Sequence, residues 1–276
     1  KPAPVDNGIR FFRTDLGNGA YVNAHMDKVV DTRLATTIGS NGITVSTTEH
    51  LLAALRSSGI DNANIDLEAS EVPIMDGSAA PFIFLIQSAG VETLNSPKKL
   101  VRIKNPIRFE NESGWAELTP YEGFKVSFEI DFDHPAVKDT KQMLEHDLSI
   151  ESYNSEISRA RTFGFMRDVE LLRSKNLGLG GNFGNAVVLD EYRVLNKDGL
   201  RYSDEFVKHK MLDAIGDLYT LGYGIIGAYH GHKSGHAINN LLLRELLQHK
   251  DDWEVVTLNS NEKAPQLYVG DNCQLS

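Results

Sequence analysis

One histidine and two aspartates recur at intervals of one helical turn in the segment Asp204 to Leu221. His209, Asp213 and Asp217 are spaced i, i+4 and i+8, and at about 100° per residue an α-helix places them on one face. A histidine and an aspartate one turn apart can chelate a single metal ion. The apolar residues of the segment lie on roughly the opposite side, at Val207, Met211, Ile215 and Leu218. The alternative is therefore a solvated polar face on an amphipathic helix, and spacing alone leaves both interpretations open.

A second candidate lies in the string Ser46-Thr47-Thr48-Glu49-His50. Ser46 and Glu49 match the helix capping box, Ser/Thr-x-x-Glu, in which His50 would be an incidental residue of the first turn. The alternative assigns His50 to a metal ion and Glu49 to the role of general base, because a carboxylate beside a metal-bound water can accept its proton. Taken by itself, the string favours the cap.

His236 is the third candidate. It follows Lys233-Ser234-Gly235 and opens an apolar helix that runs to about Leu247. A histidine in this position can act as an acid tuned near neutral pH, or it can be an exposed loop residue, which is the commoner case. The signatures of other enzyme classes are absent in their required contexts: the zincin pair, the P-loop, the dinucleotide fingerprint and the serine hydrolase elbow.

The elements that must position these residues occur twice in the same order. In the first half, a helix, a strand, a loop and a helix are expected at 50–59, 63–67, 76–78 and 79–89. In the second half, the same order is expected at 204–221, 225–229, 233–236 and 236–247. Further strands are predicted by alternation at 100–103, 115–118, 125–131 and 186–189. The repetition indicates two similar α+β domains, with chance alternation as the alternative.

The expected join between the domains is the polar stretch 95–99, which contains a proline. The predicted domains are therefore 1–96 and 97–276. A length of 276 residues suits one large or two small domains with a proper core.

Composition narrows the function further. The chain is 41% hydrophobic and 24% charged, which is typical of a soluble globular protein. Its net charge of −10 argues against nucleic-acid binding but allows a small anionic substrate. The single cysteine, Cys273, excludes an internal disulfide and a cysteine-rich zinc site. We find no signal peptide and no apolar run of the roughly 18 residues that a membrane span needs. We expect a cytoplasmic monomer.

Five sequence segments, spread along nearly the whole chain, resemble segments that a known family has in the same order. They lie at 48–51, 71–79, 158–166, 204–217 and 233–237. Together they closely resemble the UDP-3-O-acyl-N-acetylglucosamine deacetylase family of Gram-negative bacteria. The resemblance implies two α+β domains, each a sheet packed by paired helices, in a layered sandwich with the active site at the domain interface. It also implies a further N-terminal strand before position 1.

The resemblance implies roles for the three candidate sites. His50, His209 and Asp213 match the ligands of one Zn²⁺ per chain, and Glu49 matches the general base. His236 matches a protonated acid or electrostatic stabiliser, and Asp217 matches its carboxylate partner. Thr162 matches the hydroxyl that helps to hold the oxyanion.

Substrate contacts are implied as well. Lys210 and Phe163 match substrate-contacting positions, and Phe132 resembles an aromatic that meets the uridine. An insert at about 163–188 matches a hydrophobic passage for the acyl chain. Its expected lining residues are Met166, Val169, Leu172 and Ala186, with ordinary core residues as the alternative.

The implied activity is zinc-dependent hydrolysis of the N-acetyl group of UDP-3-O-acyl-N-acetylglucosamine, giving UDP-3-O-acyl-glucosamine and acetate, the committed step of lipid A biosynthesis. Two alternatives remain. One is another metal-dependent hydrolase, which the number of bound metal ions would distinguish. The other is a catalytically silent module that binds nucleotide sugars.

Overall fold

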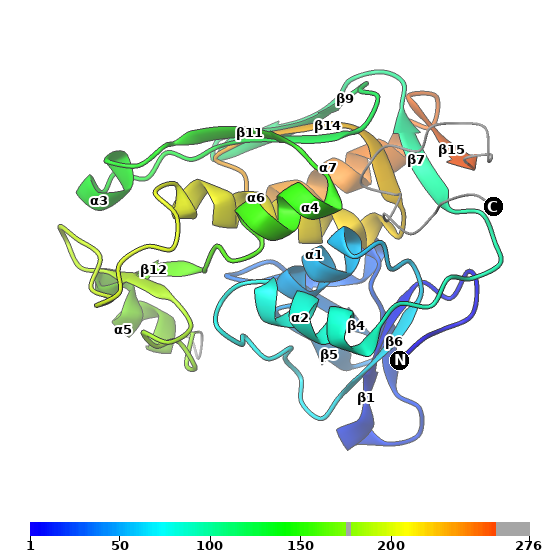
Figure 1. The fold of residues 1–276 in the computed structure, drawn as a ribbon, viewed down its shortest axis with the longest axis horizontal. Coiled ribbons are helices and arrows are strands. Elements are labelled where there is room, and N and C mark those ends of the chain that lie inside the picture. The colour runs from blue at the N-terminus through cyan, green and yellow to red at the C-terminus, as the bar shows by residue number, and fades with distance from the viewer. Residues whose placement is uncertain (175–177, 258–276) are drawn as a thin grey trace.

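The computed structural model describes residues 1–174 and 178–257. Cys273, positions 175–177 of the expected insert and the end of the expected second domain lie outside the described residues. Figure 1 shows stacked layers: a large sheet, two pairs of helices, and two small sheets. The layered α+β sandwich expected from the sequence is confirmed. The domain boundary at 96/97 stays a prediction.

The two small sheets come from the first part of the chain. One has the order β2-β1-β6, with β1 parallel to β6 and antiparallel to β2. Its strands are β1 (Ile9–Arg13), β2 (Tyr21–Asn23) and β6 (Ala63–Leu67). The other is an antiparallel sheet of β3 (Val29–Asp31), β4 (Thr37–Ser40) and β5 (Ile43–Val45).

The large sheet comes from the later part of the chain. Its central strand, β14, pairs in parallel with β10 and β7 and antiparallel with β9. Its strands are β7 (Lys99–Ile103), β8 (Ile107–Asn111), β9 (Gly114–Thr119), β10 (Phe124–Glu129), β11 (Met143–Asp147), β14 (Gly224–His232) and β15 (Trp253–Thr257). β14 is longer than the predicted 225–229, because Ala228 to His232 continue the ladder against β9.

Four helices lie between the large and the small sheets. They are α1 (Glu49–Ser57), α2 (Ala80–Ala89), α6 (Glu205–Leu218) and α7 (His236–Gln248). α6 and α7 pack on the large sheet, and α1 packs against both α2 and α6. Gly222, in the left-handed conformation with φ of 84°, ends the short 3₁₀ turn Tyr219–Leu221 that follows α6. The helical segment thus ends at 221, as predicted, with a 3₁₀ turn as its last part.

Buried apolar side chains form a continuous core through these layers. Phe11, Leu52, Leu118, Leu212 and Leu242 are among its members and belong to the sheets and helices of both halves. Burial of this apolar surface is the main favourable contribution to folding. None of the helices in the described part of the chain has the length and apolar character needed to cross a bilayer.

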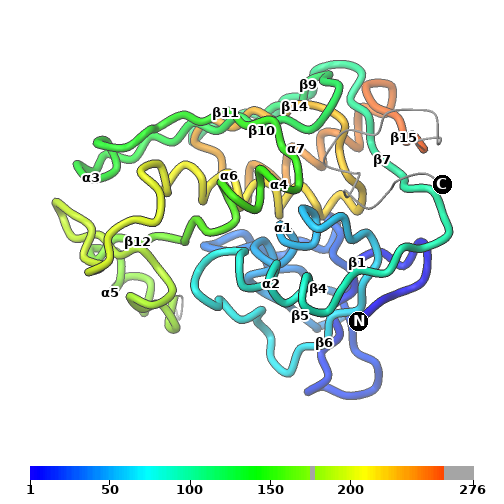
Figure 2. The backbone as a smooth tube through the Cα atoms, viewed as in Figure 1, coloured from blue at the N-terminus to red at the C-terminus, as the bar shows by residue number. Residues whose placement is uncertain are grey.

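Shorter elements complete the later part of the chain. They are α3 (Pro135–Lys138), α4 (Ile150–Ser152), a π-helical turn (Tyr153–Ile157), β12 (Phe163–Phe165), α5 (Met166–Ser174) and β13 (Val187–Leu189). In Figure 2, the segment around β12 and α5 projects to one side of the two helix layers. This segment is the expected passage insert.

Candidate active site

Three predicted residues converge where α1 packs against α6. His50 lies on α1, His209 and Asp213 lie on α6, and each is at most 4% exposed. Nε2 of His50 and Nε2 of His209 lie 3.4 Å and 3.3 Å from Oδ1 of Asp213. With bonds of about 2.0–2.1 Å, neighbouring ligands on a tetrahedral ion are about 3.3–3.4 Å apart. The group therefore has the geometry to hold one metal ion.

The hydrogen bonds around this group leave the facing atoms available. Nδ1 of His209 donates to the carbonyl oxygen of Ala160 at 3.0 Å, so Nε2 is the bare nitrogen of the neutral ring. Burial lowers the pKa of His209 to about 4, which keeps the ring neutral. Oδ2 of Asp213 accepts from Lys210 Nζ at 2.6 Å, but Oδ1 is buried without a hydrogen-bond partner among the described residues. A metal ion would satisfy that oxygen.

The same helix face was open to a second interpretation. His209, Asp213 and Asp217 are 2%, 4% and 3% exposed, so the solvated polar face is wrong. The predicted apolar side of α6 is buried too. Both sides are covered because α6 lies between α1 and the large sheet.

Glu49 is the first residue of α1 and is 2% exposed. The N-cap is Thr48, which makes no side-chain cap bond. The Ser46 hydroxyl accepts a hydrogen bond from Thr37 at 2.8 Å, and Glu49 Oε2 accepts one from the backbone N–H of Thr36 at 3.0 Å. The capping-box interpretation is therefore wrong, and the Glu49 carboxylate is not needed at the helix end.

A strained residue sets the direction in which α1 begins. Thr47 has φ of 57°, a left-handed conformation that β-branched residues rarely adopt. Its hydroxyl donates to Oε1 of Glu71 at 2.7 Å. Such a conformation costs about 1–3 kcal/mol and persists only where the surroundings fix it. The bond to Glu71 thus holds the turn that leads to Glu49.

His236 and Asp217 form a buried ion pair next to Glu49. His236 is the first residue of α7, and its Nδ1 donates to Oδ2 of Asp217 at 2.8 Å. Burial disfavours the cation, but the charge and hydrogen bond of Asp217 outweigh burial and raise the pKa of His236 to about 9. His236 is therefore cationic at neutral pH. Burial also raises the pKa of Glu49, and the charge of His236 opposes that rise.

Two further residues, which the sequence did not indicate, hold Asp217. Oγ1 of Thr36 donates to its Oδ1 at 2.6 Å, and Nδ2 of Asn239 donates to its Oδ2 at 2.8 Å. Asn239 follows His236 by three positions on α7, a spacing that places them on one face. Nothing near Thr36 signals its role, because its side-chain partner is 181 positions away.

Two of the predicted substrate-contacting residues are aromatic and lie beside the metal-binding group. The ring centroids of Phe132 and Phe163 are 5.3 Å apart, and Phe163 meets the His209 ring edge-on at 6.3 Å. Lys210, the third, lies next to the same group through its bond to Asp213. The structure thus brings all three into one neighbourhood.

Thr162 lies at a tight junction between segments. Its backbone N–H donates to the carbonyl of Gly77 at 2.8 Å, and its own carbonyl accepts from Val187 at 2.8 Å. Gly77 has φ of 85°, and a Cβ there would lie 2.1 Å from the carbonyl oxygen of Asn185. Only glycine fits this approach, so the loop before α2 is pressed directly against the insert.

The four expected passage residues are not core residues. Met166 is 45% exposed, and the described helix α5 has no buried residue. The other three are half-buried: Val169, Leu172 and Ala186. The alternative of ordinary core packing is therefore wrong.

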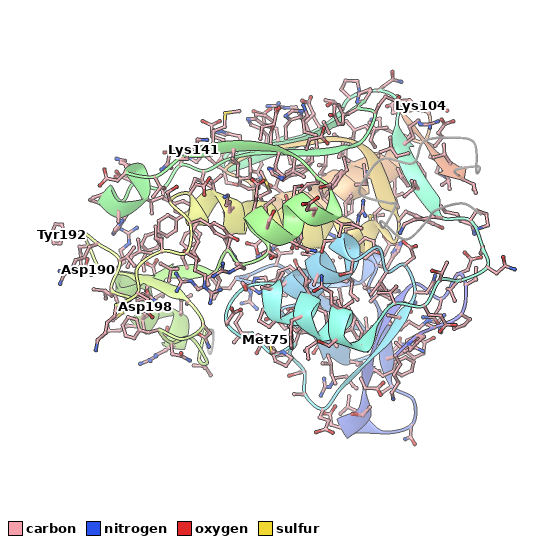
Figure 3. The ribbon with its side chains drawn as sticks, in the orientation of Figure 1. Met75, Lys104, Lys141, Asp190, Tyr192 and Asp198 are labelled. Carbon is pink, nitrogen blue, oxygen red and sulfur yellow. The ribbon has the colours of Figure 1, made fainter. Side chains whose placement is uncertain are left out.

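Besides the ring contacts of Phe163, a hydrogen bond joins the segment that follows β13 to the segment that follows β10. Ring nitrogen Nε2 of His134 donates to the carbonyl oxygen of Asp190 at 2.7 Å. Figure 3 labels Asp190 and Tyr192 at this outer end, away from the stacked layers. The insert thus leans on the segment that follows β10.

Comparison with known proteins gives a consistent result. A family model described as UDP-3-O-acyl N-acetylglycosamine deacetylase matches residues 1–248. Three similar proteins each carry the name UDP-3-O-acyl-N-acetylglucosamine deacetylase. The protein of Acidithiobacillus ferrooxidans is 57% identical over 256 residues, 93% of this chain and 84% of the relative. That of Hahella chejuensis is 55% identical over 269 residues (98% and 89%), and that of Nitrosococcus oceani 56% over 264 residues (96% and 87%).

Proposed function

Because the chain belongs to the UDP-3-O-acyl N-acetylglycosamine deacetylase family, we propose that it hydrolyses the acetamide of UDP-3-O-acyl-N-acetylglucosamine. The products are acetate and UDP-3-O-acyl-glucosamine, in the committed step of lipid A biosynthesis. The observation that carries this function is the buried group of His50, His209 and Asp213 with Glu49 next to it in the chain. The base, the acid and the metal-binding group all come from one chain, so we expect a monomer. The cytoplasmic location stays a prediction.

We propose zinc as the metal, one ion per chain. Two neutral imidazole nitrogens and one carboxylate oxygen are three protein ligands, the number typical of catalytic zinc sites, which keep a position open. A zinc ion held by His50, His209 and Asp213 would supply Lewis acidity, polarising a carbonyl and making a water more acidic.

The protein's own groups then account for the proton transfers. Glu49 takes a proton from the attacking water as its oxygen bonds to the acetyl carbon. Cationic His236 stabilises the negative charge on the former carbonyl oxygen and donates its proton to the leaving amine as the C–N bond breaks. Asp217 keeps His236 protonated. The Thr162 hydroxyl donates a hydrogen bond to the former carbonyl oxygen.

The remaining residues bind the two ends of the substrate. Lys210 keeps two ammonium protons beyond the one given to Asp213 and would act as a point charge toward the diphosphate. Phe163 and Phe132 offer ring faces near the reacting group and the uridine. The acyl chain would lie along the insert, against Met166, Val169, Leu172 and Ala186.

The test compares acetate release by the wild type and by Glu49→Gln, with the metal content of each measured. The glutamine side chain can still accept the Thr36 hydrogen bond but cannot take a proton. We expect it to keep one zinc per chain and to lose about 10²–10⁴-fold in kcat.

Glu68→Gln, an exposed change in the same half, is the matched control and should keep wild-type activity. If kcat of Glu49→Gln falls by less than about tenfold, Glu49 is not the general base. A zinc-loaded wild type that binds the nucleotide sugar without releasing acetate would favour the silent binding module. Two zinc ions per active chain would favour a different metal hydrolase.

A further inference from the structure

Every polar group of Thr36 forms a hydrogen bond with a segment of the candidate active site. It is 2% exposed and lies between β3 and β4, next to the start of α1. Its N–H donates to Glu49 Oε2 at 3.0 Å, and its hydroxyl donates to Asp217 Oδ1 at 2.6 Å. Its carbonyl accepts from the Thr48 hydroxyl at 3.0 Å. One residue thus contacts both the proposed base and the counter-ion of the proposed acid.

The bond between Thr36 and Asp217 has a fixed direction. An ionised carboxylate can only accept hydrogen bonds, so the hydroxyl must donate. A short bond to a charged acceptor is among the stronger hydrogen bonds in proteins. It also spans the two halves of the molecule, because Asp217 lies on α6 and Thr36 lies beside the small sheet of β3, β4 and β5.

The two oxygens of Asp217 have separate partners. Oδ1 accepts from Thr36, whereas Oδ2 accepts from His236 at 2.8 Å and Asn239 at 2.8 Å. Asn239 is itself oriented by the hydroxyls of Tyr229 and Ser234, which donate to its Oδ1 at 2.7 Å and 2.6 Å. Without the Thr36 bond, the carboxylate would be held only on the side that faces His236.

We propose that Thr36 is a positioning residue that holds Glu49 and Asp217 in fixed relation, so that the base and the acid meet the substrate in matched geometry. The inference rests on the deacetylase function proposed above. The two contacts of Thr36 are joined by a few covalent bonds, so a shift of one carboxylate is transmitted to the other. A displacement of about 1 Å between such catalytic groups can lower the rate on the order of 10²-fold.

The test uses the full chain, loaded with zinc, as Thr36→Val and Thr36→Ser. Valine has the same shape and backbone preference, keeps the N–H to Glu49 and lacks only the hydroxyl. We expect Thr36→Val to lower kcat by about 10–10²-fold, with KM changed less than about threefold. Thr36→Ser keeps the hydroxyl and should recover kcat to within about threefold of the wild type.

Thr37→Val is the matched control. It removes a neighbouring hydroxyl that donates to Ser46 at 2.8 Å and touches neither carboxylate. If Thr36 has only a structural role, both valine variants lower Tm to a similar extent and neither selectively lowers kcat. A selective loss of kcat in Thr36→Val supports positioning.

A double-mutant cycle shows whether Thr36 acts through Asp217. In an Asp217→Asn background, Thr36→Val should cause little further loss of kcat, since the group that it positions is already altered. Full additivity of the two losses overturns the proposal.

The wild type, measured in the same assay, separates the two levels of inference. If wild type releases acetate and Thr36→Val equals it, only the role of Thr36 is overturned. If zinc-loaded wild type is inert, the deacetylase function and the role of Thr36 fall together.

Discussion

At the scale of single residues, the charge of His236 depends on one carboxylate. Asp217 raises the pKa of His236 to about 9 against the effect of burial. The cation is therefore present below pH 9 and is lost as the pH rises through that value. Any stability that the pair contributes follows the same sign: it is complete below the unfolded pKa of about 6.5 and is lost toward pH 9.

We expect kcat/KM to fall above about pH 9 in the wild type, as His236 loses its proton. In Asp217→Asn, the largest charge that opposes burial is removed and only Glu49 and Asp213 still raise the pKa of His236, so the fall should move to lower pH. A profile of kcat/KM between pH 6 and 10 measures both. His249→Asn, at the far end of α7, is the control and should leave the profile unchanged. If kcat/KM of Asp217→Asn falls at the same high pH as that of the wild type, the fall reports the titration of another group.

The sequence predicted which residues lie together in the candidate site, but not the hydrogen bonds that hold them. Their spacing alone made His209 and Asp213 candidate metal ligands, because one turn of helix brings them together. The pattern of Ser46 and Glu49 misled, since two residues three apart fit a cap whether or not the helix begins between them. Thr36 could not be predicted, because its partners are brought to it only by the tertiary fold.

At the scale of elements, α1 and α6 cross most closely beside Glu49. A Cβ built on Gly216 of α6 would lie 2.0 Å from the carbonyl oxygen of Glu49 and 2.7 Å from its carbonyl carbon. The backbone of α1 cannot give way without moving the first residue of the helix. The contact therefore couples the helix crossing to the position of the proposed base.

Gly216→Ala should destabilise the protein, although alanine favours an isolated helix by about 1 kcal/mol over glycine. Forcing the helices apart costs about 1–3 kcal/mol, and the displaced Glu49 should lower kcat as well. Denaturant unfolding and acetate release measure the two effects. Gly180→Ala, where a Cβ meets nothing within 4 Å, should change stability by less than about 0.5 kcal/mol. A Gly216→Ala variant with wild-type stability would contradict the close crossing.

The helices and strands that the sequence predicted are present, but others, such as β1 to β5, were not predicted, and neither were the surroundings of α6. The order of helix, strand, loop and helix was confirmed in both halves, since local periodicity determines it. The burial of α6 on two sides was missed, because a polar face looks solvated until its polar partners are known. Those partners, on α1, lie more than 150 positions earlier in the chain.

At the scale of the whole molecule, helix α5 of the insert stands to one side of the packed layers (Figure 2). α5 contributes no buried side chain within its described length, so bulk can be added there without disturbing the core. On the passage proposed above, we expect substitutions on α5 to change substrate selection with little effect on stability.

We expect Val169→Trp to lower kcat/KM for long-chain substrates about 10–100-fold more than for short-chain ones, with Tm within about 2 °C of the wild type. Leu171→Trp, on the same helix and 56% exposed, is the matched control and should affect both substrates little. Kinetics with acyl chains of two lengths and a thermal melt provide the measurements. Equal impairment of long and short chains would argue against the passage.

The distribution of the metal-binding group along the chain has a consequence for biosynthesis. His50 is translated long before His209 and Asp213. At about 5–20 residues per second, the intervening stretch takes on the order of ten to thirty seconds to make. During that time the nascent chain presents one ligand of three. We therefore expect the complete group to bind its metal ion only after Asp213 has been made and has left the ribosome.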